Sequence, residues 1–280
     1  MDHFPQDTSK FKLIVSDVDG TLMGRDRIIS DKNTIAIKNW QNNGRLFTIA
    51  SGRQYFMLKN DIKNLEITMP VIVRGGSEII DPVTDNVLYS QNIDADTLAD
   101  FTKTLVSSNY DFMIEKDNAL YGSYEYDISM YQHLIMKKAE DFSHQDAPKV
   151  NVPLGNRTIE EFEKFVNLLI DMYPQLNIVR SYNDLGKSLD VTSKSATKNL
   201  SVLELIKLLK LEREEVVGVG DGYNDFPLME ACGFKVAMGN AREELKAISD
   251  VIVPRQEEDG VAYLIEELLR RGPAAPHPHS

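Results

Sequence analysis

The feature that most constrains the fold is the alternation of short apolar runs with helical segments at both ends of the chain. Each apolar run has the length of a strand, and the segments between the runs show helical spacing of apolar residues. Strands joined by helices pair in parallel, so this alternation predicts an α/β fold with a Rossmann-like parallel sheet and helices on both faces. Along the first part of the chain the predicted elements are strand 11–16, helix 31–43, strand 45–50, helix 53–65 and strand 71–73.

The middle of the chain has a different pattern. Residues 85–90 have the character of the return arm of a hairpin, and from there to about residue 186 the sequence predicts an α+β insert. Residues 158–161 (TIEE) form a capping-box sequence, which opens one helix of this insert. The predicted elements of the insert are helix 94–109, strands 110–115 and 119–123, helix 158–173 and strand 177–182.

The first pattern resumes in the last third of the chain. A helix is predicted over residues 197–209, with Leu200, Leu203, Ile206 and Leu209 on one face. Further predicted elements are strand 215–219, a short helix with Pro227 in its first turn, strand 234–238, a helix from residue 241, strand 251–253 and a helix from residue 260. The resulting division is a core domain of residues 1–83 and 187–272, an inserted domain of residues 84–186, and a disordered Pro/Ala-rich tail of residues 273–280.

Composition narrows the class of protein. The chain has 280 residues, of which 42% are apolar, and this suits one large domain with a smaller insert. The net charge of −12 argues against nonspecific nucleic-acid binding, and the single cysteine cannot form a disulfide framework or a thiolate metal site. No stretch approaches the ~20 apolar residues of a membrane span. The first residues lack the basic and apolar segments of a signal peptide, so we expect a cytoplasmic protein without a membrane partner.

Two aspartates stand directly after the first predicted strand, within residues 17–21 (DVDGT). In parallel sheets, ligands bind at the carboxyl ends of the strands. At this position Asp17 and Asp19, with Gly20 to turn the chain, form a compact anionic site for a hard cation. The alternative is a solvated turn at a strand end, because Asp-Gly is common in turns.

A second acidic group follows a later strand, within residues 220–225 (GDGYND). If the two strands lie side by side, Asp221 and Asp225 converge on the aspartates of the DVDGT segment. Clustered carboxylates repel one another unless a cation neutralises them, so Mg²⁺ is implied. An Asp-Gly turn is again the alternative. A dinucleotide-binding fingerprint needs a third glycine at position 223, where this chain has tyrosine, and an oxidoreductase is therefore disfavoured.

Three further residues are candidates for anion binding. Ser51 and Gly52 follow the second strand and precede a helix, where a hydroxyl and a backbone N–H can hold an anion. Lys198 lies near the start of a helix, where the helix dipole disfavours a cation, and this unfavourable placement suggests a functional role rather than a solvated surface lysine. Arg74, by contrast, is expected at the surface rather than in contact with substrate.

At this point the sequence resembles a known family. DVDGT, then Ser51-Gly52-Arg53, then a lysine at a helix start, then GDGYND are similar, in that order, to the four motifs of the haloacid dehalogenase superfamily. The insert after the second motif resembles the C2-type cap of the Cof-like sugar-phosphate phosphatases. The resemblance covers the chain from Phe11 to Leu269. It departs from many relatives in having serine rather than threonine at position 51, and in Gly75-Gly76-Ser77 where they have Asn-Gly-Ala.

The resemblance implies a role for each matching residue. Asp17 would be the nucleophile and a Mg²⁺ ligand, and Asp19 the general acid/base, which also binds the metal through its backbone carbonyl. Asp221 would be the remaining metal carboxylate, and Asp225 would orient its neighbours. The implied phosphate-binding groups are Ser51, the backbone of Gly52, Lys198 and Asn224, the last of which contacts the phosphate or the metal shell.

The sequence therefore predicts a Mg²⁺-dependent phosphatase that hydrolyses a small phosphorylated metabolite, such as a sugar phosphate, through an aspartyl-phosphate on Asp17. Two alternatives stay open at this stage. One is a phosphomutase or phosphotransferase with the same site residues, and the other is a metabolite-binding module without catalysis. The physiological substrate, the cap residues that contact it and the oligomeric state are not readable from the sequence.

Overall fold

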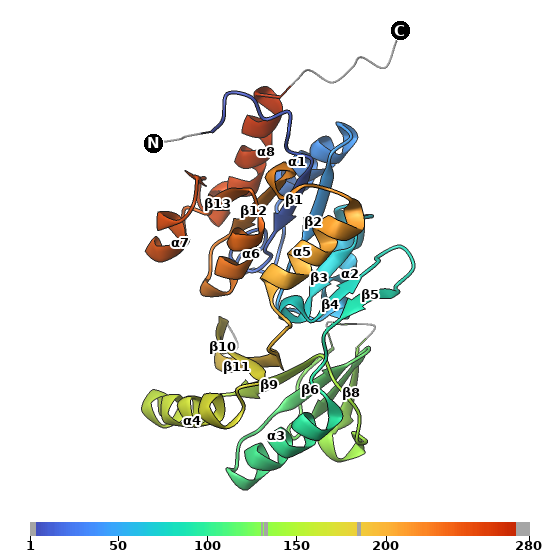
Figure 1. Cartoon of the computed structure of the whole chain (residues 1–280), viewed down its shortest axis with the longest axis vertical. Coiled ribbons are helices and arrows are strands. Elements are labelled where there is room, and N and C mark those ends of the chain that lie inside the picture. Colours follow the sequence, from blue (N-terminus) through green and yellow to red (C-terminus); the bar gives the residue numbers. More distant parts are fainter. Residues whose placement is uncertain (1–3, 130, 132–133, 184–185, 273–280) are drawn as a thin grey trace.

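The computed structural model describes residues 4–129, 131, 134–183 and 186–272. They form two stacked domains, a core domain that carries both ends of the described chain and a cap domain on the other side of a cleft (Figure 1). The predicted disordered tail, residues 273–280, lies outside the described residues. In the described part of the chain, no helix has the length and apolar character needed to cross a membrane.

The core domain is built on a five-stranded sheet in which all neighbouring strands are parallel. An isolated bridge between Ala50 and Ile72 continues the parallel pairing to a further strand, β3. The predicted parallel α/β core is confirmed. From edge to edge the sheet consists of β14 (Val251–Ile252), β13 (Phe234–Ala237), β12 (Val216–Gly220), β1 (Leu13–Ser16) and β2 (Leu46–Ile49).

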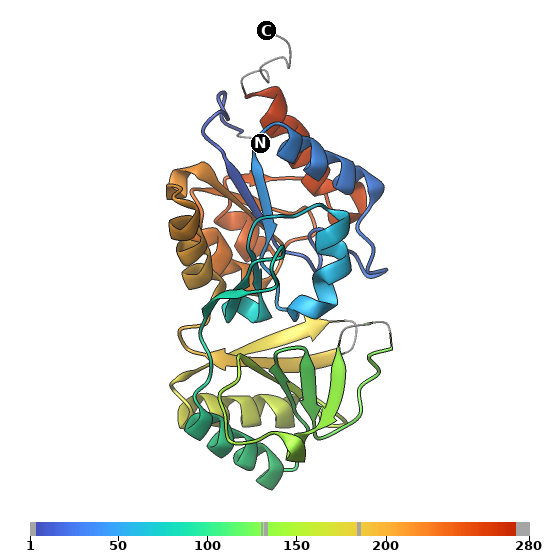
Figure 2. The ribbon, with the colours of Figure 1, turned by 90° about the vertical axis from the view of Figure 1, so that its right-hand side faces the viewer.

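Helices cover both faces of this sheet, because successive side chains of its buried strands point to opposite faces. On β1, Ile14 packs into one apolar cluster, whereas Leu13 and Val15 pack into another. In Figure 2 the strands lie between the blue and red helices α1 and α8 and the orange helices α5 and α6. The helices of the core are α1 (Asp31–Asn42), α2 (Tyr55–Asn64), α5 (Lys198–Leu209), α6 (Phe226–Ala231), α7 (Glu243–Ala247) and α8 (Gly260–Arg270).

The buried face of α5 agrees with the predicted one only in part, because Ile206 is buried and Leu209 packs partly against the core. Leu200 and Leu203 are 42% and 41% exposed. The face that meets the core contains Lys198, Ser201, Val202, Leu205 and Ile206. Both sets of residues have helical spacing, but two of the buried positions are polar, so the stripe that packs on the sheet is less apolar in sequence than the stripe beside it.

A three-stranded antiparallel sheet follows α2 and leads to the cap domain. Its strands are β3 (Val71–Val73), β4 (Glu78–Ile80) and β5 (Val87–Ser90), and the predicted hairpin arm at 85–90 is confirmed as β5. Between β3 and β4 the chain turns through a 3₁₀ helix, Arg74–Gly76, in which all three residues have positive φ. At Gly76 a Cβ would lie 2.4 Å from the backbone of Thr197, so this turn packs directly against the start of α5.

The cap domain is a six-stranded mixed sheet with two helices on one face. The apolar side chains of its helices and of every second strand residue form a separate core, for example Phe101, Val166, Val150 and Leu189. The predicted capping box at Thr158 is present. In sheet order the strands are β10 (Leu176–Asn183), β11 (Gly186–Ser193), β9 (Lys149–Pro153), β6 (Met113–Lys116), β7 (Ala119–Gly122) and β8 (Ile135–Lys138), and the helices are α3 (Ala95–Ser107) and α4 (Ile159–Met172).

Strand pairing moves both predicted ends of the inserted domain. β5 pairs with β4 beside the core, so the chain leaves the core after Ser90 rather than at residue 84. β11 pairs with β9 and β10, so the predicted boundary between 186 and 187 would cut the cap sheet. We therefore propose residues 91–194 as the cap domain. The two crossings meet at its ends, where the Ser195 hydroxyl donates to Gln91 Oε1 at 2.7 Å.

Candidate active site

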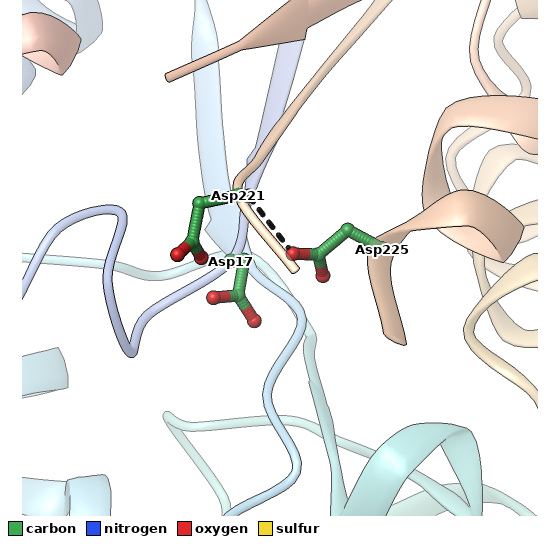
Figure 3. Close-up of side chains that lie close together, drawn as sticks. All are labelled: Asp17, Asp221 and Asp225. Atoms are coloured by element: carbon green, nitrogen blue, oxygen red, sulfur yellow. Dashed lines mark hydrogen bonds between the residues drawn. The ribbon is translucent and has the colours of Figure 1, made fainter. Parts of the chain in front are cut away.

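Three predicted site residues lie at one edge of the core sheet because each follows a parallel strand. Asp17 follows β1, Ser51 comes shortly after β2, and Asp221 follows β12. β1 lies between β12 and β2 in the sheet, so the three strand ends are neighbours. Asp17 is 3% exposed and Ser51 is fully buried. Figure 3 shows the carboxyl groups of Asp17, Asp221 and Asp225 lying close together at this edge.

Lys198 lies at the first position of α5 and reaches two of these carboxylates. Its Nζ donates to Asp17 Oδ1 at 2.5 Å and to Asp225 Oδ1 at 2.6 Å. All three side chains are buried. The helix start is fixed by Thr197, whose hydroxyl accepts the N–H of Leu200. The helix dipole disfavours a lysine in this first turn, so Lys198 is stabilised there by its two carboxylate partners.

Asp225 orients the turn after β12. Its Oδ2 accepts the backbone N–H of Asp221 at 3.0 Å and that of Gly222 at 2.9 Å, and Figure 3 draws the first of these bonds. A Cβ at Gly220 would lie 2.6 Å from the Asp225 side chain, so glycine is needed at that position. With its other oxygen on Lys198, Asp225 has both carboxylate oxygens engaged by groups of this chain.

Asp221 is held beside the DVDGT turn. Its carboxylate accepts from the Thr21 hydroxyl at 3.3 Å and from Asn240 Nδ2 at 3.3 Å. Gly20 has φ +85°, and a Cβ there would lie 2.3 Å from an Asp221 oxygen. Glycine is therefore required at position 20 for two reasons. The backbone there is left-handed, and the turn that carries Asp221 approaches too closely for a Cβ.

The electrostatics of this group fit a hard cation. One oxygen from each of Asp17, Asp221 and Asp225 lies within 4.8 Å of the others. Burial, and next the charge of Asp225, raise the pKa of Asp17 well above its ordinary value, and the same two causes raise the pKa of Asp221 to about 7. Burial lowers the pKa of Lys198, but Asp17 and Asp225 outweigh it, and the net pKa is raised. Three carboxylates thus share one ammonium, a deficit that a divalent cation corrects.

Asp19 occupies a different environment from Asp17. Its carboxylate forms a bidentate pair with the Arg53 guanidinium, at 2.9 Å from Nε and 2.5 Å from Nη2, and its side chain is 53% exposed. The group of three carboxylates does not include the Asp19 side chain. From the sequence, Arg53 stands out only as the last residue of the Ser-Gly-Arg motif, with no predicted contact. No local pattern marks this pair, since the two residues are 34 positions apart.

The loop of Ser51, Gly52 and Arg53 presents one free donor toward the cleft. Ser51 Oγ accepts the N–H of Arg53 at 3.1 Å. The carbonyls of Ser51 and Arg53 accept from the N–H groups of Gly75 and Arg74. Among the described residues, the Gly52 N–H has no hydrogen-bond partner, and Gly52 lines the cleft. The loop is therefore fixed by its neighbours and leaves one amide for an anion.

Asn224 also lines the cleft, but it is exposed and lies outside the carboxylate group. It sits in the 3₁₀ turn Tyr223–Asp225, with its Oδ1 folded over the Cα of Gly222, where a Cβ would meet it at 2.4 Å. The turn thus presents Asn224 to the cleft as an exposed side chain.

Arg74 is not the surface residue that the sequence suggests. Its side chain is 2% exposed, pairs with Glu78, and lies 3.2 Å from Glu115 of the cap. Its Nη2 donates to the backbone carbonyl of Asp117 in the cap at 2.5 Å. Arg74 does not line the cleft, so it is a buried contact between the domains and not a substrate contact.

A cleft of about 720 Å³ lies between the two domains and has Asp17, Asp19 and Asp221 on its core side. This volume is within the usual range for small-molecule sites. On the cap side, strands β6, β9 and β11 have one face toward the cap helices and the other toward the cleft. The residues on the cleft face are mostly polar. The cap residues of this polar strip are Glu115, Lys149, Asn151, Ser188 and Asp190, and the apolar end beside them contains Met113, Leu120, Tyr124, Tyr126 and Tyr131.

Comparison with known proteins agrees with this geometry. A family model described as haloacid dehalogenase-like hydrolase matches residues 14–265, which include both domains. The chain is 27% identical to phosphatase YwpJ of Bacillus subtilis, over 92% of this chain and all of that protein. It is 28% identical to 5-amino-6-(5-phospho-D-ribitylamino)uracil phosphatase YwtE of the same organism, over 92% and 98%. A solved haloacid dehalogenase-like hydrolase from B. subtilis superposes with a TM-score of 0.80 at 26% identity, covering 92% of this chain and 100% of that one.

Proposed function

The chain belongs to the haloacid dehalogenase-like hydrolase family and is a phosphatase, and we propose that it hydrolyses a small phosphomonoester with Mg²⁺ and through an aspartyl-phosphate on Asp17. The observation that carries the proposal is the contact between buried Asp17 and the ammonium of Lys198. A carboxylate at the base of a cleft, with a fixed cation beside it, is suited to attack an anionic phosphorus centre, because the cation offsets the repulsion between the two anions.

The chain's residues divide the chemistry between them. An Asp17 oxygen forms a bond to phosphorus while the bond from phosphorus to the leaving oxygen breaks, and Asp19 supplies a proton to that oxygen. In the second step Asp19 takes a proton from water as the water attacks phosphorus, and the bond to Asp17 breaks. Before the first step Asp19 must leave the guanidinium of Arg53, which occupies both of its oxygens in this structure.

The carboxylates fit the metal. Asp17, Asp221 and the backbone carbonyl of Asp19 would hold Mg²⁺, whose role when bound is to neutralise charge on the attacking carboxylate and the phosphoryl oxygens. Asp225 is proposed to orient rather than to bind the metal directly, because Lys198 and two backbone N–H groups already engage its two oxygens.

Four groups of the core domain are proposed to bind the phosphoryl oxygens. They are the free N–H of Gly52, the hydroxyl of Ser51, the ammonium of Lys198 and the amide of Asn224. Asn224 is exposed in the turn Tyr223–Asp225 and lines the cleft, so its amide is available to a phosphoryl oxygen.

The cleft supports a small phosphorylated metabolite, such as a sugar phosphate, as substrate. The polar strip of the cap lies opposite Gly52 and offers hydrogen bonds to hydroxyl groups close to the phosphate. The apolar end with its three tyrosines suits a flat or apolar portion farther along the molecule. The name of relative YwtE describes a phosphorylated ribitylaminouracil, a compound with both kinds of group.

The proposal is tested by measuring phosphate release from a panel of phosphomonoesters, together with mass spectrometry of acid-quenched enzyme. We expect phosphate release by the native protein and a transient phosphoryl adduct on Asp17. The Asp17→Asn variant should lose activity at least about a thousandfold and form no adduct. Asp31→Asn, the same change at the exposed start of α1, is the control and should stay fully active. Retention of a tenth of native activity by Asp17→Asn would reject Asp17 as the nucleophile.

A further inference from the structure

A lysine of the cap domain reaches into the phosphate-binding loop of the core. Lys149, the first residue of β9, donates from its Nζ to the backbone carbonyl of Gly52 at 2.8 Å. The two residues are 97 positions apart and belong to different domains. The Lys149 side chain is only 6% exposed, so this contact is enclosed between cap and core.

The ammonium is held in place by carboxylates of the cap. Lys149 Nζ lies 2.9 Å from Asp190 Oδ1 and 3.7 Å from Glu115 Oε1. Burial lowers the pKa of Lys149, but Asp190 and Glu115 outweigh it and the net pKa is raised, so the group stays charged. Two of the three N–H donors of this lysine therefore have close partners, Gly52 and Asp190, whereas Glu115 lies at ion-pair distance only.

Within the described part of the cap, the contact to the Gly52 carbonyl is the one hydrogen bond to a backbone group of this loop. The carbonyls on either side, those of Ser51 and Arg53, accept from Gly75 and Arg74 of the core. The peptide between Gly52 and Arg53 is held by the core through its N–H, which donates to Ser51 Oγ at 3.1 Å, and by the cap through its carbonyl. Lys149 thus supplies one of the two contacts that fix the orientation of this peptide.

We propose that Lys149 is a positioning residue, by which closure of the cap sets the phosphate-binding loop. On one side of the fixed peptide is the Gly52 N–H, which faces the cleft without a partner among the described residues. On the other side is Arg53, whose guanidinium holds Asp19. The cap would thus help to order the loop that carries this phosphate donor and Arg53, the residue from which Asp19 must separate before the first step, in addition to contacting the leaving group. The expected effect on catalysis rests on the proposed function, whereas the ordering of the loop by Lys149 does not.

The test compares Lys149→Met with Arg74→Lys. Methionine keeps the unbranched apolar stem of the lysine and removes its ammonium donors. The Arg74 side chain bridges the same two domains through Glu115 and Asp117 without touching the loop, so Arg74→Lys reports weakening of the interface alone. Two quantities are measured: kcat and KM on an aryl phosphate, and hydrogen–deuterium exchange of the peptide that covers residues 51–54.

We expect Lys149→Met to lower kcat about tenfold or more with a smaller change in KM, and to speed exchange in residues 51–54. Arg74→Lys should leave both close to native. A rise in KM with unchanged kcat would make Lys149 a direct ligand of the substrate and overturn the proposal. Unchanged exchange in Lys149→Met, or equal effects in the two variants, would overturn it as well. If the native protein hydrolysed no phosphomonoester, the proposed function would fail, whereas the exchange experiment would still decide whether Lys149 fixes the loop.

Discussion

The molecule contains two buried groups of charged side chains, which differ in how far their charges are balanced within the chain. At the edge of the core sheet, Asp17, Asp221 and Asp225 share the single ammonium of Lys198. The pKa values of Asp17 and Asp221 are raised there, first by burial and then by the charge of Asp225. This group is electrostatically incomplete without a further cation.

Between the domains, the second group brings two cations to three carboxylates. Arg74 pairs with Glu78 and Glu115, and Lys149 pairs with Asp190. Both cations also donate to backbone carbonyls across the interface. This interdomain group is close to complete within the chain itself.

The difference distinguishes a charge group that needs a ligand from one whose charges are largely matched within the chain. A group whose charges are not balanced within the chain can be completed by a ligand. At the edge of the core sheet, the proposed ligands are a metal ion and a phosphoryl group. A group that the chain completes fixes how two parts meet, and the net stabilisation from such buried pairs is small even though loss of one partner is strongly destabilising.

The sharpest contrast should come from removing divalent cations. In EDTA we expect activity to be abolished, with Mg²⁺ restoring it and Ca²⁺ substituting poorly because it favours a larger and looser coordination shell. Mg²⁺ should also raise the Tm, since it binds the folded site. Turnover and thermal melts with and without each ion are the measurements. Full activity in a chelated sample would show that the site group is complete without a metal.

Lys198→Met removes the only cation of the site group. We expect activity to fall about a hundredfold or more, because both the attacking carboxylate and the phosphoryl oxygens lose their fixed positive charge. Lys207→Met, on the exposed side of the same helix, is the matched control and should stay active. An active Lys198→Met variant would mean that the metal alone suffices to hold the phosphoryl group.

Arg74→Met breaks the interdomain group instead. Because Glu78 and Glu115 are then left buried without this partner, we expect the free energy of unfolding to fall by about 3–5 kcal/mol. Provided the variant is folded at the assay temperature, kcat should stay within about threefold of native, since Arg74 touches neither the substrate cleft nor the loop through its side chain. Denaturant melts and steady-state kinetics measure the two effects. A large loss of kcat with unchanged stability would reverse the distinction between the groups.

The smallest effect should be a pH dependence of stability in the metal-free protein. The pKa of Asp221 is raised from 3.8 to about 7 in the folded state, so the folded form binds the extra proton. Its contribution to stability is present below pH 3.8 and is lost as the pH rises through about 7. Thermal melts in EDTA should therefore show this decline, and Asp221→Asn or added Mg²⁺ should reduce it. An unchanged slope in Asp221→Asn would assign it to other groups.

The sequence was enough to predict those site residues that follow the ends of strands. Asp17, Asp221 and Ser51 could be brought together because parallel strands end at one edge of a sheet, a rule that needs only the order of elements. Lys198 could be proposed because its charge is unfavourable at a helix start. These inferences use local pattern and topology, and both are visible in one chain.

The residues that escaped prediction act across long separations and show no local pattern. Arg53 meets Asp19 at 34 positions, Arg74 meets Glu115 at 41, and Lys149 meets Gly52 at 97. The end of the cap was missed for a related reason. β11 has the alternation of any half-buried strand, and only its pairing with β9 assigns it to the cap sheet.

The meeting of the two crossings at Gln91 and Ser195 has a consequence for how the chain folds. Strand β1 must pair with the central strand β12, which is synthesised about two hundred residues later. Holding the ends of the intervening hundred-residue cap together in an unfolded chain costs about 4 kcal/mol of loop-closure entropy. A cap that folds first on the ribosome removes that term, because its own sheet brings both ends to one point. We therefore expect the cap to fold before the core that surrounds it in sequence.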